Sequence, residues 1–241
     1  MQERYLGDIH DFYKFNFLKF LSKKINQKIG LNWYLINPKN LGDNELKKND
    51  GEKRDYLTKS SSYISDETLK KEMYYLKLSK NRKLEKFTKN SHLRFFLDFY
   101  NSELTKSNRE KWFKQSIDFF KKNSLIFLDP DNGLLKKKNN NKTSIKYIFL
   151  DDIKEYNKVG KTVIYNQFQP FNKKHRIFLS EIIKLLKTKN LNVNLPVIRN
   201  RTSPNTFFLT IGKDIKLNIR LKKIYQQYKD EGCDDIELIT I

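Results

Sequence analysis

The sequence predicts an α/β fold with three layers: a Rossmann-like, mostly parallel sheet with an antiparallel C-terminal strand pair, covered by helices on both faces. Strand-length apolar segments alternate with amphipathic helical segments along the 241 residues. The segment Leu125–Asp129 is apolar on both faces, which is typical of a parallel strand between two helical layers. We expect one domain, 1–241, with a helical insertion or cover at about 64–122.

The N-terminal third predicts one helix and one strand. From Ile9 to Lys24, large apolar residues recur at three- and four-residue steps, which indicates an amphipathic helix, and Asp8 is its expected N-cap. Leu31–Ile36 reads as the first strand. The polar stretch 37–62 is expected to be a loop, and it contains no G-x-G sequence of the kind that binds dinucleotides.

The middle third predicts helices around the central strand. Helices are expected over Asp66–Lys80 with Ser65 as the cap, over His92–Glu103 and over Asn108–Lys122, where Trp112 is a core residue. A short strand at Tyr147–Leu150 precedes a helix that Asp151 caps and that ends near Gly160.

The C-terminal third predicts two helices and four strands. The helices cover His175–Lys187 and Ile215–Lys229, and the strands cover Thr162–Phe168, Asn194–Ile198, Thr206–Ile211 and Ile236–Ile241. The second and third of these strands have a short connector, which favours an antiparallel pair.

The charge predicts a polyanionic partner. There are 49 Lys and Arg residues against 28 Asp and Glu, a net charge of +21. Nucleic acid is the first expectation and an anionic membrane surface the second, while a solvated lysine-rich surface without a partner is the alternative. The segment Lys136, Lys137 and Lys138 and the connector residues Arg199 and Arg201 are the candidate nucleic-acid contacts.

Other functional classes are excluded or disfavoured by composition. The single Cys233 excludes an internal disulfide and a multi-cysteine zinc site. The three histidines lie far apart in the sequence, which disfavours zinc. Because there is no apolar run of membrane-spanning length and no signal-peptide core, we expect a cytoplasmic protein without membrane contact. The sequence makes no prediction of the oligomeric state.

The candidate catalytic residues follow the central strand. Ligands of open α/β sheets bind beyond the carboxyl ends of the strands, so the residues Asp129, Pro130, Asp131 and Asn132 are placed where such sites occur. Pro130 stiffens this corner, and Gly133 permits the positive φ that closes a turn. A plain strand exit made of turn-forming residues is the alternative interpretation.

Two short motifs resemble a known family. Gly7, Asp11 and Lys14 have the spacing of a G-x-x-x-D-x-x-K motif at the start of the first predicted helix, and Asp129–Asn132 is similar to an Asp-Pro-Pro-Tyr turn. With the late hairpin and terminal helix, this pattern resembles the large-subunit ribosomal RNA adenine-N6 methyltransferases, and more broadly the Rossmann-like adenine methyltransferases that use S-adenosylmethionine.

The resemblance implies roles for particular residues. Gly7, Asp11, Lys14 and Asn37 would lie at the S-adenosylmethionine site. Asp129 would accept a hydrogen bond from the target amine, with the Pro130 carbonyl as a second acceptor. Asn132 stands where the family has a stacking aromatic, a role that would pass to Phe168 or Tyr34.

Three functions therefore follow as expectations. The first is methyl transfer to an exocyclic amine, adenine N6, of RNA or DNA. The second is a Mg²⁺-dependent nuclease in which Asp129 and Asp131 hold the metal. The third is a non-catalytic nucleic-acid-binding protein on a degenerate methyltransferase scaffold.

Overall fold

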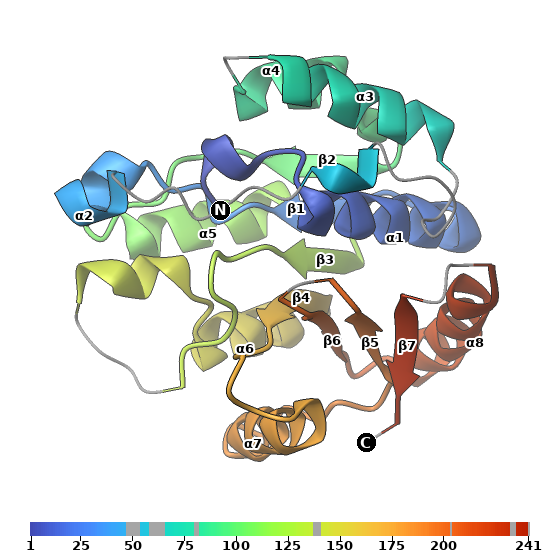
Figure 1. Ribbon diagram of the computed structural model, residues 1–241. Helices are drawn as coiled ribbons and strands as arrows, with labels where there is room; N and C mark the ends of the chain where they lie inside the picture. Colours follow the sequence, from blue (N-terminus) through green and yellow to red (C-terminus); the bar gives the residue numbers. More distant parts are fainter. Residues whose placement is uncertain are drawn as a thin grey trace.

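The structure confirms the three-layer α/β fold. It is a computed structural model that describes residues 1–46, 54–57, 66–79, 82–136, 141–202, 204–231 and 235–240. One seven-stranded sheet has the order β2-β1-β3-β4-β6-β5-β7 (Figure 1). The strands are β1 Ile29–Asn32, β2 Leu97–Tyr100, β3 Leu125–Leu128, β4 Thr162–Phe168, β5 Val197–Asn200, β6 Thr206–Ile211 and β7 Ile236–Ile239.

The sheet is parallel in its first half and antiparallel in its second. β2, β1, β3 and β4 run parallel to one another, whereas β6 pairs antiparallel with both β4 and β5. The predicted antiparallel pair is therefore confirmed, and β7 extends this half by pairing antiparallel with β5.

Helices cover both faces. The α-helices are α1 Ile9–Ile25, α2 Asp43–Leu46, α3 Glu67–Leu78, α4 Leu84–Asn90, α5 Arg109–Phe119, α6 Leu150–Lys158, α7 His175–Lys187 and α8 Ile215–Glu231. The 3₁₀ helices are η1 Glu3–Tyr5, η2 Pro38–Leu41, η3 Asp55–Leu57, η4 His92–Phe95 and η5 Lys142–Lys146. One core joins α1, α3, α4 and α8 to the sheet, and a second core joins α5, α6 and α7 to the opposite face (Figure 1).

The central strand β3 belongs to both cores. Leu125 and Phe127 pack in the first core, and Ile126 and Leu128 pack in the second. All four side chains are fully buried, as a strand that is apolar on both faces requires. Trp112 is buried as predicted, and it lies in the second core.

Several predicted elements differ from the structure. The helix predicted over His92–Glu103 is wrong, because this segment forms the short helix η4 and then the edge strand β2. The region 64–122 therefore contributes a strand as well as helices, and its helices lie on both faces of the sheet. The first strand lies earlier than Leu31–Ile36, at Ile29–Asn32.

Local capping also corrects the sequence analysis. Asp8 caps α1 as predicted, since its carboxylate accepts a hydrogen bond from the Asp11 N–H. Asp151 does not cap α6. Phe149 is the N-cap residue, and its N–H donates to the Asp152 carboxylate. Ser65 lies outside the described residues.

Two further boundaries change with the structure. Tyr147–Leu150 is not a strand, although Ile148 forms an isolated bridge with Leu134. The described parts of the stretch 37–62, predicted as loop, contain the short helices η2, α2 and η3.

Candidate functional site

The candidate site lies at the switch point of the sheet. β1 pairs with β2 on one side and with β3 on the other, and the chain reaches β2 before it crosses to β3. Crevices at such reversals bind the ligands of doubly wound proteins. The Asp129 N–H donates to the Asn32 carbonyl at 2.9 Å, which ties the residue after β3 to the end of β1.

The four predicted catalytic residues share one cavity. Asp129, Pro130, Asp131 and Asn132 all line a cavity of about 550 Å³, called the small cavity below. The Asn132 N–H donates to the Lys146 carbonyl at 3.0 Å. Gly133 has φ +82°, as the predicted turn requires.

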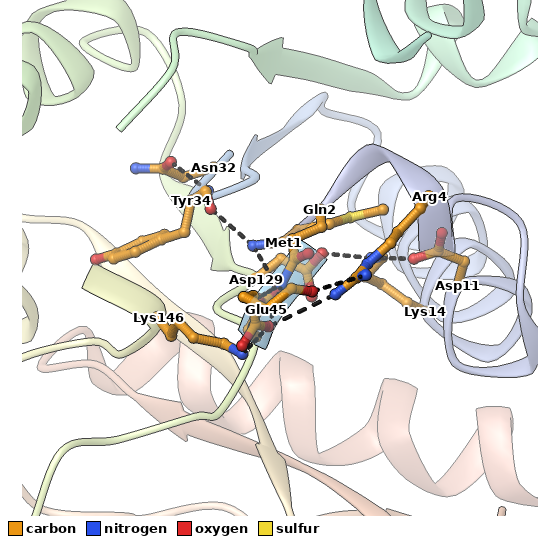
Figure 2. Close-up of polar contacts among 11 residues, drawn as sticks. Met1, Gln2, Arg4, Asp11, Lys14, Asn32, Tyr34, Glu45, Asp129 and Lys146 are labelled. Atoms are coloured by element: carbon orange, nitrogen blue, oxygen red, sulfur yellow. Dashed lines mark hydrogen bonds and ion pairs between the residues drawn. The ribbon is translucent and has the colours of Figure 1, made fainter. Parts of the chain in front are cut away.

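Lys14 holds two carboxylates together at the wall of this cavity. Its Nζ lies 2.5 Å from Asp11 Oδ1 and 2.5 Å from Asp129 Oδ2, and all three side chains are buried (Figure 2). Nζ also lies 4.6 Å from the centre of the Trp33 ring, a cation–π distance. Asp11 and Lys14 of the N-terminal motif are therefore brought to Asp129, 115 residues later in the chain.

The pKa values of both Lys14 and Asp129 are raised in this buried group. Burial would lower the pKa of Lys14, but Asp11 and Asp129 outweigh it and raise that pKa, so the ammonium stays charged. Burial raises the pKa of Asp129, Lys14 opposes the rise, and Asp11 adds to it. One cation shared by two buried carboxylates leaves one of them resistant to ionisation.

Asp129 keeps one oxygen for other partners. Oδ2 accepts the hydrogen bond from Lys14, while Oδ1 accepts none from any residue in the described ranges. Lys14 thus fixes the orientation of the carboxylate, and Oδ1 is left for a group that enters the small cavity.

Gly7 forms hydrogen bonds that hold the start of α1. Its N–H donates to Asp11 Oδ2 at 2.8 Å, and its carbonyl accepts from Arg54 at 2.6 Å and from Tyr56 at 2.9 Å. Gly7 does not line either of the two hollows described here. It anchors the start of α1, and with it Asp11 and Lys14.

A second ionic group lies behind Asp131. The carboxylate of Asp131 lies 2.8 Å from the Met1 amino group, 2.9 Å from Gln2 Nε2 and 3.7 Å from Lys146 Nζ. Lys146 and Gln2 also contact Glu45, at 2.8 and 3.0 Å (Figure 2). Burial would raise the pKa of Asp131, but the Met1 amino group and Lys146 outweigh it, and the pKa is lowered.

Aromatic and amide side chains also line the small cavity. Phe168 and Asn166 of β4 and Phe171 of the following loop line it, and the His10 ring lies edge-on to Phe168 at 5.2 Å between centroids. Phe168 is thus one of the two rings suggested for stacking. The other, Tyr34, is fully buried and donates from its hydroxyl to Asp152.

A second hollow of about 1260 Å³ lies beyond the ends of β1 and β2. Asn37 lines it, so the four residues predicted for the methyl donor do not converge: Asp11 and Lys14 line the small cavity instead. This large hollow has the apolar residues Leu35, Ile36, Pro38 and Leu78, the acidic residues Glu3, Glu85 and Glu103, and the basic residues Arg4, Lys39, Lys77, Arg82, Lys83, Lys86 and Lys89.

The residues predicted to contact nucleic acid do not form one surface of unpaired positive charge in the described part of the chain. Lys136 lies 2.7 Å from Glu181, and Arg199 lies 2.7 Å from Glu237. The Arg201 side chain is exposed, and its backbone N–H donates to the Asp235 carbonyl. Lys137 and Lys138 lie outside the described residues.

The described residues contain neither a metal-ligand cluster nor a helix of membrane-spanning character. No group of three or more described His, Cys, Asp or Glu side chains is arranged to hold a metal ion. Asp129 and Asp131, the magnesium candidates, face Lys14 and the Met1 amino group instead. No helix in the described ranges is long and apolar enough to span a membrane.

Sequence reasoning missed three polar residues of this region. Glu45 and Lys146 come from segments whose sequences show no site motif, and only tertiary structure brings them to Asp131. Asn166 had a usable signal, because it interrupts the apolar strand Thr162–Phe168. No protein-family profile, curated protein or solved structure matches this chain.

Proposed function

We propose that the protein is an S-adenosylmethionine-dependent methyltransferase that acts on an exocyclic amine, adenine N6, of RNA or DNA. One observation supports this most directly. Asp129 has an oxygen without a described partner, and it lines the small cavity together with Phe168, at the switch point of a Rossmann-like sheet. An acceptor oxygen beside an aromatic ring suits a planar base that bears an amine.

The large hollow suits the methyl donor. Its acidic residues can accept hydrogen bonds from ribose hydroxyls and an α-amino group, its basic residues can pair with a carboxylate, and its apolar residues can contact adenine. Glu103 follows β2, the position from which doubly wound proteins bind a ribose. When bound, S-adenosylmethionine would supply the electrophilic methyl group.

The residues of the small cavity would prepare the amine. Asp129 Oδ1 accepts one amine hydrogen, the Pro130 carbonyl offers a second acceptor, and the nitrogen lone pair is directed away from both. Lys14 holds the carboxylate in place through Oδ2. Because the raised pKa keeps part of Asp129 protonated at low pH, transfer would increase as pH rises through that pKa.

The rim of the large hollow suits the nucleic-acid backbone. Seven basic residues and three acidic residues line it, and Lys39, Lys77 and Lys86 are exposed without an ion pair to any described residue. Lysines of this kind contact phosphates irrespective of sequence.

The test combines donor binding with methyl transfer. Calorimetry should show that the purified chain binds S-adenosylmethionine and S-adenosylhomocysteine, and Glu103→Gln should weaken this binding. Transfer of a labelled methyl group to mixed RNA and DNA should fall by at least ~100-fold in Asp129→Ala, with donor affinity retained. Asp151→Ala, which changes an exposed aspartate on α6, is the control.

The outcomes separate the proposed functions. Absence of donor binding at millimolar concentration would overturn the methyltransferase proposal. Cleavage of nucleic acid that requires Mg²⁺ would then favour the nuclease, and binding of nucleic acid without either activity would favour a non-catalytic protein.

A further inference from the structure

Asn166 is a buried amide that faces the small cavity without a described partner. Its side chain is 4% exposed, and its Oδ1 atom has no hydrogen-bond partner among the described residues. A buried acceptor without a partner is destabilising by about 1–3 kcal/mol and is rare in folded proteins. A ligand in the cavity that donates a hydrogen bond would supply the missing partner.

The sheet register places Asn166 next to Asp129. β3 and β4 are parallel with Leu128 opposite Tyr165, so the next pair along the two chains is Asp129 and Asn166. Side chains alternate along a strand, and both residues continue the face on which Phe127 and Ile164 enter the first core. Two acceptor groups therefore lie side by side on one wall.

An exposed ring stands at the same cavity. Phe171 is 86% exposed although it lines the cavity, and it follows Phe168 by three residues. Exposed aromatic side chains beside a polar pocket serve as stacking platforms for single nucleobases.

We infer that Asn166 recognises the amine-bearing edge of an unpaired nucleobase, and that Phe171 stacks on the base from the cavity mouth. An exocyclic amine has two hydrogens, one for Asp129 Oδ1 and one for Asn166 Oδ1, which here takes the place of the Pro130 carbonyl as second acceptor. The Asn166 Nδ2 can donate to the adjacent ring nitrogen. A base in a duplex cannot enter the cavity, so the substrate is single-stranded or has its base flipped out. This inference rests on the proposed function only for the assignment of the cavity to the acceptor base.

Binding of defined oligonucleotides tests the inference without any methyl transfer. The probes are fluorescent single-stranded oligothymidines with one central deoxyadenosine or one purine deoxyriboside, which lacks the 6-amino group, and the equivalent RNAs. We expect wild type to prefer the adenine probe by roughly 25- to 100-fold in Kd, the value of about two hydrogen bonds. Asn166→Leu should reduce this preference by roughly 5- to 10-fold, because the hydrogen bond from the amine to Asp129 remains.

Matched variants separate recognition from folding. Asn166→Leu should unfold at the same temperature as wild type or higher, because it replaces an unpartnered polar group by an apolar one of similar size. Asn200→Ala is the control, since Asn200 Oδ1 is also buried without a described partner but does not line the cavity. Phe171→Ala should weaken both probes equally, by roughly 5- to 100-fold.

The possible results distinguish this inference from the proposed function. A wild-type preference that is undiminished in Asn166→Leu, or a marked loss of stability in that variant, would overturn the role of Asn166. Equal binding of both probes by wild type would overturn it too, even if the protein binds S-adenosylmethionine. A preference reduced in Asn166→Leu, in a protein that does not bind the donor, would support base recognition and contradict methyl transfer.

Discussion

At the scale of single residues, the site depends on one buried cation. Lys14 compensates two carboxylates that approach from different parts of the chain, Asp11 from α1 and Asp129 from the end of β3. The spacing of Asp11 and Lys14 places them on one helix face, so their contact could be predicted from the sequence. The contact with Asp129 could not, because it depends on how α1 packs on the sheet.

The first prediction concerns the removal of this cation. Lys14→Met should lower the free energy of unfolding by about 3–5 kcal/mol, since it leaves buried carboxylates without compensation. Urea denaturation at pH 7 measures the change. In Lys14→Met/Asp129→Asn much of the loss should be recovered, because one of the uncompensated charges is gone. If the double variant is as unstable as the sum of its single variants, the three groups are not coupled.

The second prediction concerns the pH dependence of Asp8. Burial and the neighbouring Asp11 carboxylate raise the pKa of Asp8 to about 8. Because the folded protein then holds a proton that the unfolded chain releases near pH 4, Asp8 stabilises the fold at low pH and this contribution is lost as pH rises towards 8. Asp8→Asn keeps the N-cap oxygen and removes the titration.

Wild type should therefore lose stability relative to Asp8→Asn between pH 4 and pH 8, by up to about 1.4 kcal/mol per pH unit. Urea denaturation of both proteins at several pH values measures this difference. A constant difference across that range would contradict a raised pKa.

At the scale of elements, the sequence predicted best the features that depend only on residues a few positions apart. The buried strand β3, the cap of α1 and the left-handed Gly160 after α6 all follow from residues within a few positions. β2 did not, because Leu93, Phe96, Leu97 and Tyr100 have helical spacing. The segment becomes a strand by pairing with β1, in the register Ile29 with Leu97.

The third prediction concerns the turn that carries Asp131 and Asn132. An added Cβ at Gly133, which has φ +82°, would lie 2.5 Å from Gln167 Oε1. That same oxygen accepts a hydrogen bond from the Leu134 N–H. Gly133→Ala should therefore suffer backbone strain, a steric clash and a weakened hydrogen bond, and it should displace the turn that carries Asp131 and Asn132.

Gly160→Ala is the matched control, because φ is +77° there and an added Cβ meets nothing within 4 Å. We expect Gly160→Ala to cost about 1 kcal/mol and Gly133→Ala at least about 2 kcal/mol more, measured by thermal unfolding. Equal losses in the two variants would mean that the turn adjusts to the new methyl group without strain.

At the scale of the whole molecule, the net charge predicts a class of partner, but the cations singled out in the sequence are not the ones that the fold gathers around one hollow. The sequence drew attention to clustered cations, yet Lys136 and Arg199 are paired with Glu181 and Glu237. The cations around the large hollow come from η1, η2, α3, α4 and the residues just before α4, and these segments meet only in the fold. Because these cations come from separate segments, no short basic run in the sequence marks the surface that they form.

The last prediction tests whether that surface binds nucleic acid. Each lysine that contacts a phosphate releases a counterion, so its removal lowers the salt dependence of binding as well as the affinity. Lys39/Lys77/Lys86→Gln should reduce the slope of log K against log salt concentration by about 2–3 for a single-stranded oligonucleotide, as measured by fluorescence anisotropy. Lys216/Lys222/Lys223→Gln removes the same charge from exposed positions of α8 and should leave the slope nearly unchanged.

An equal reduction by both triple variants would mean that the net charge of +21, and not the rim of the large hollow, attracts the nucleic acid. A reduction confined to the first would place the phosphate contacts of the strand at this rim.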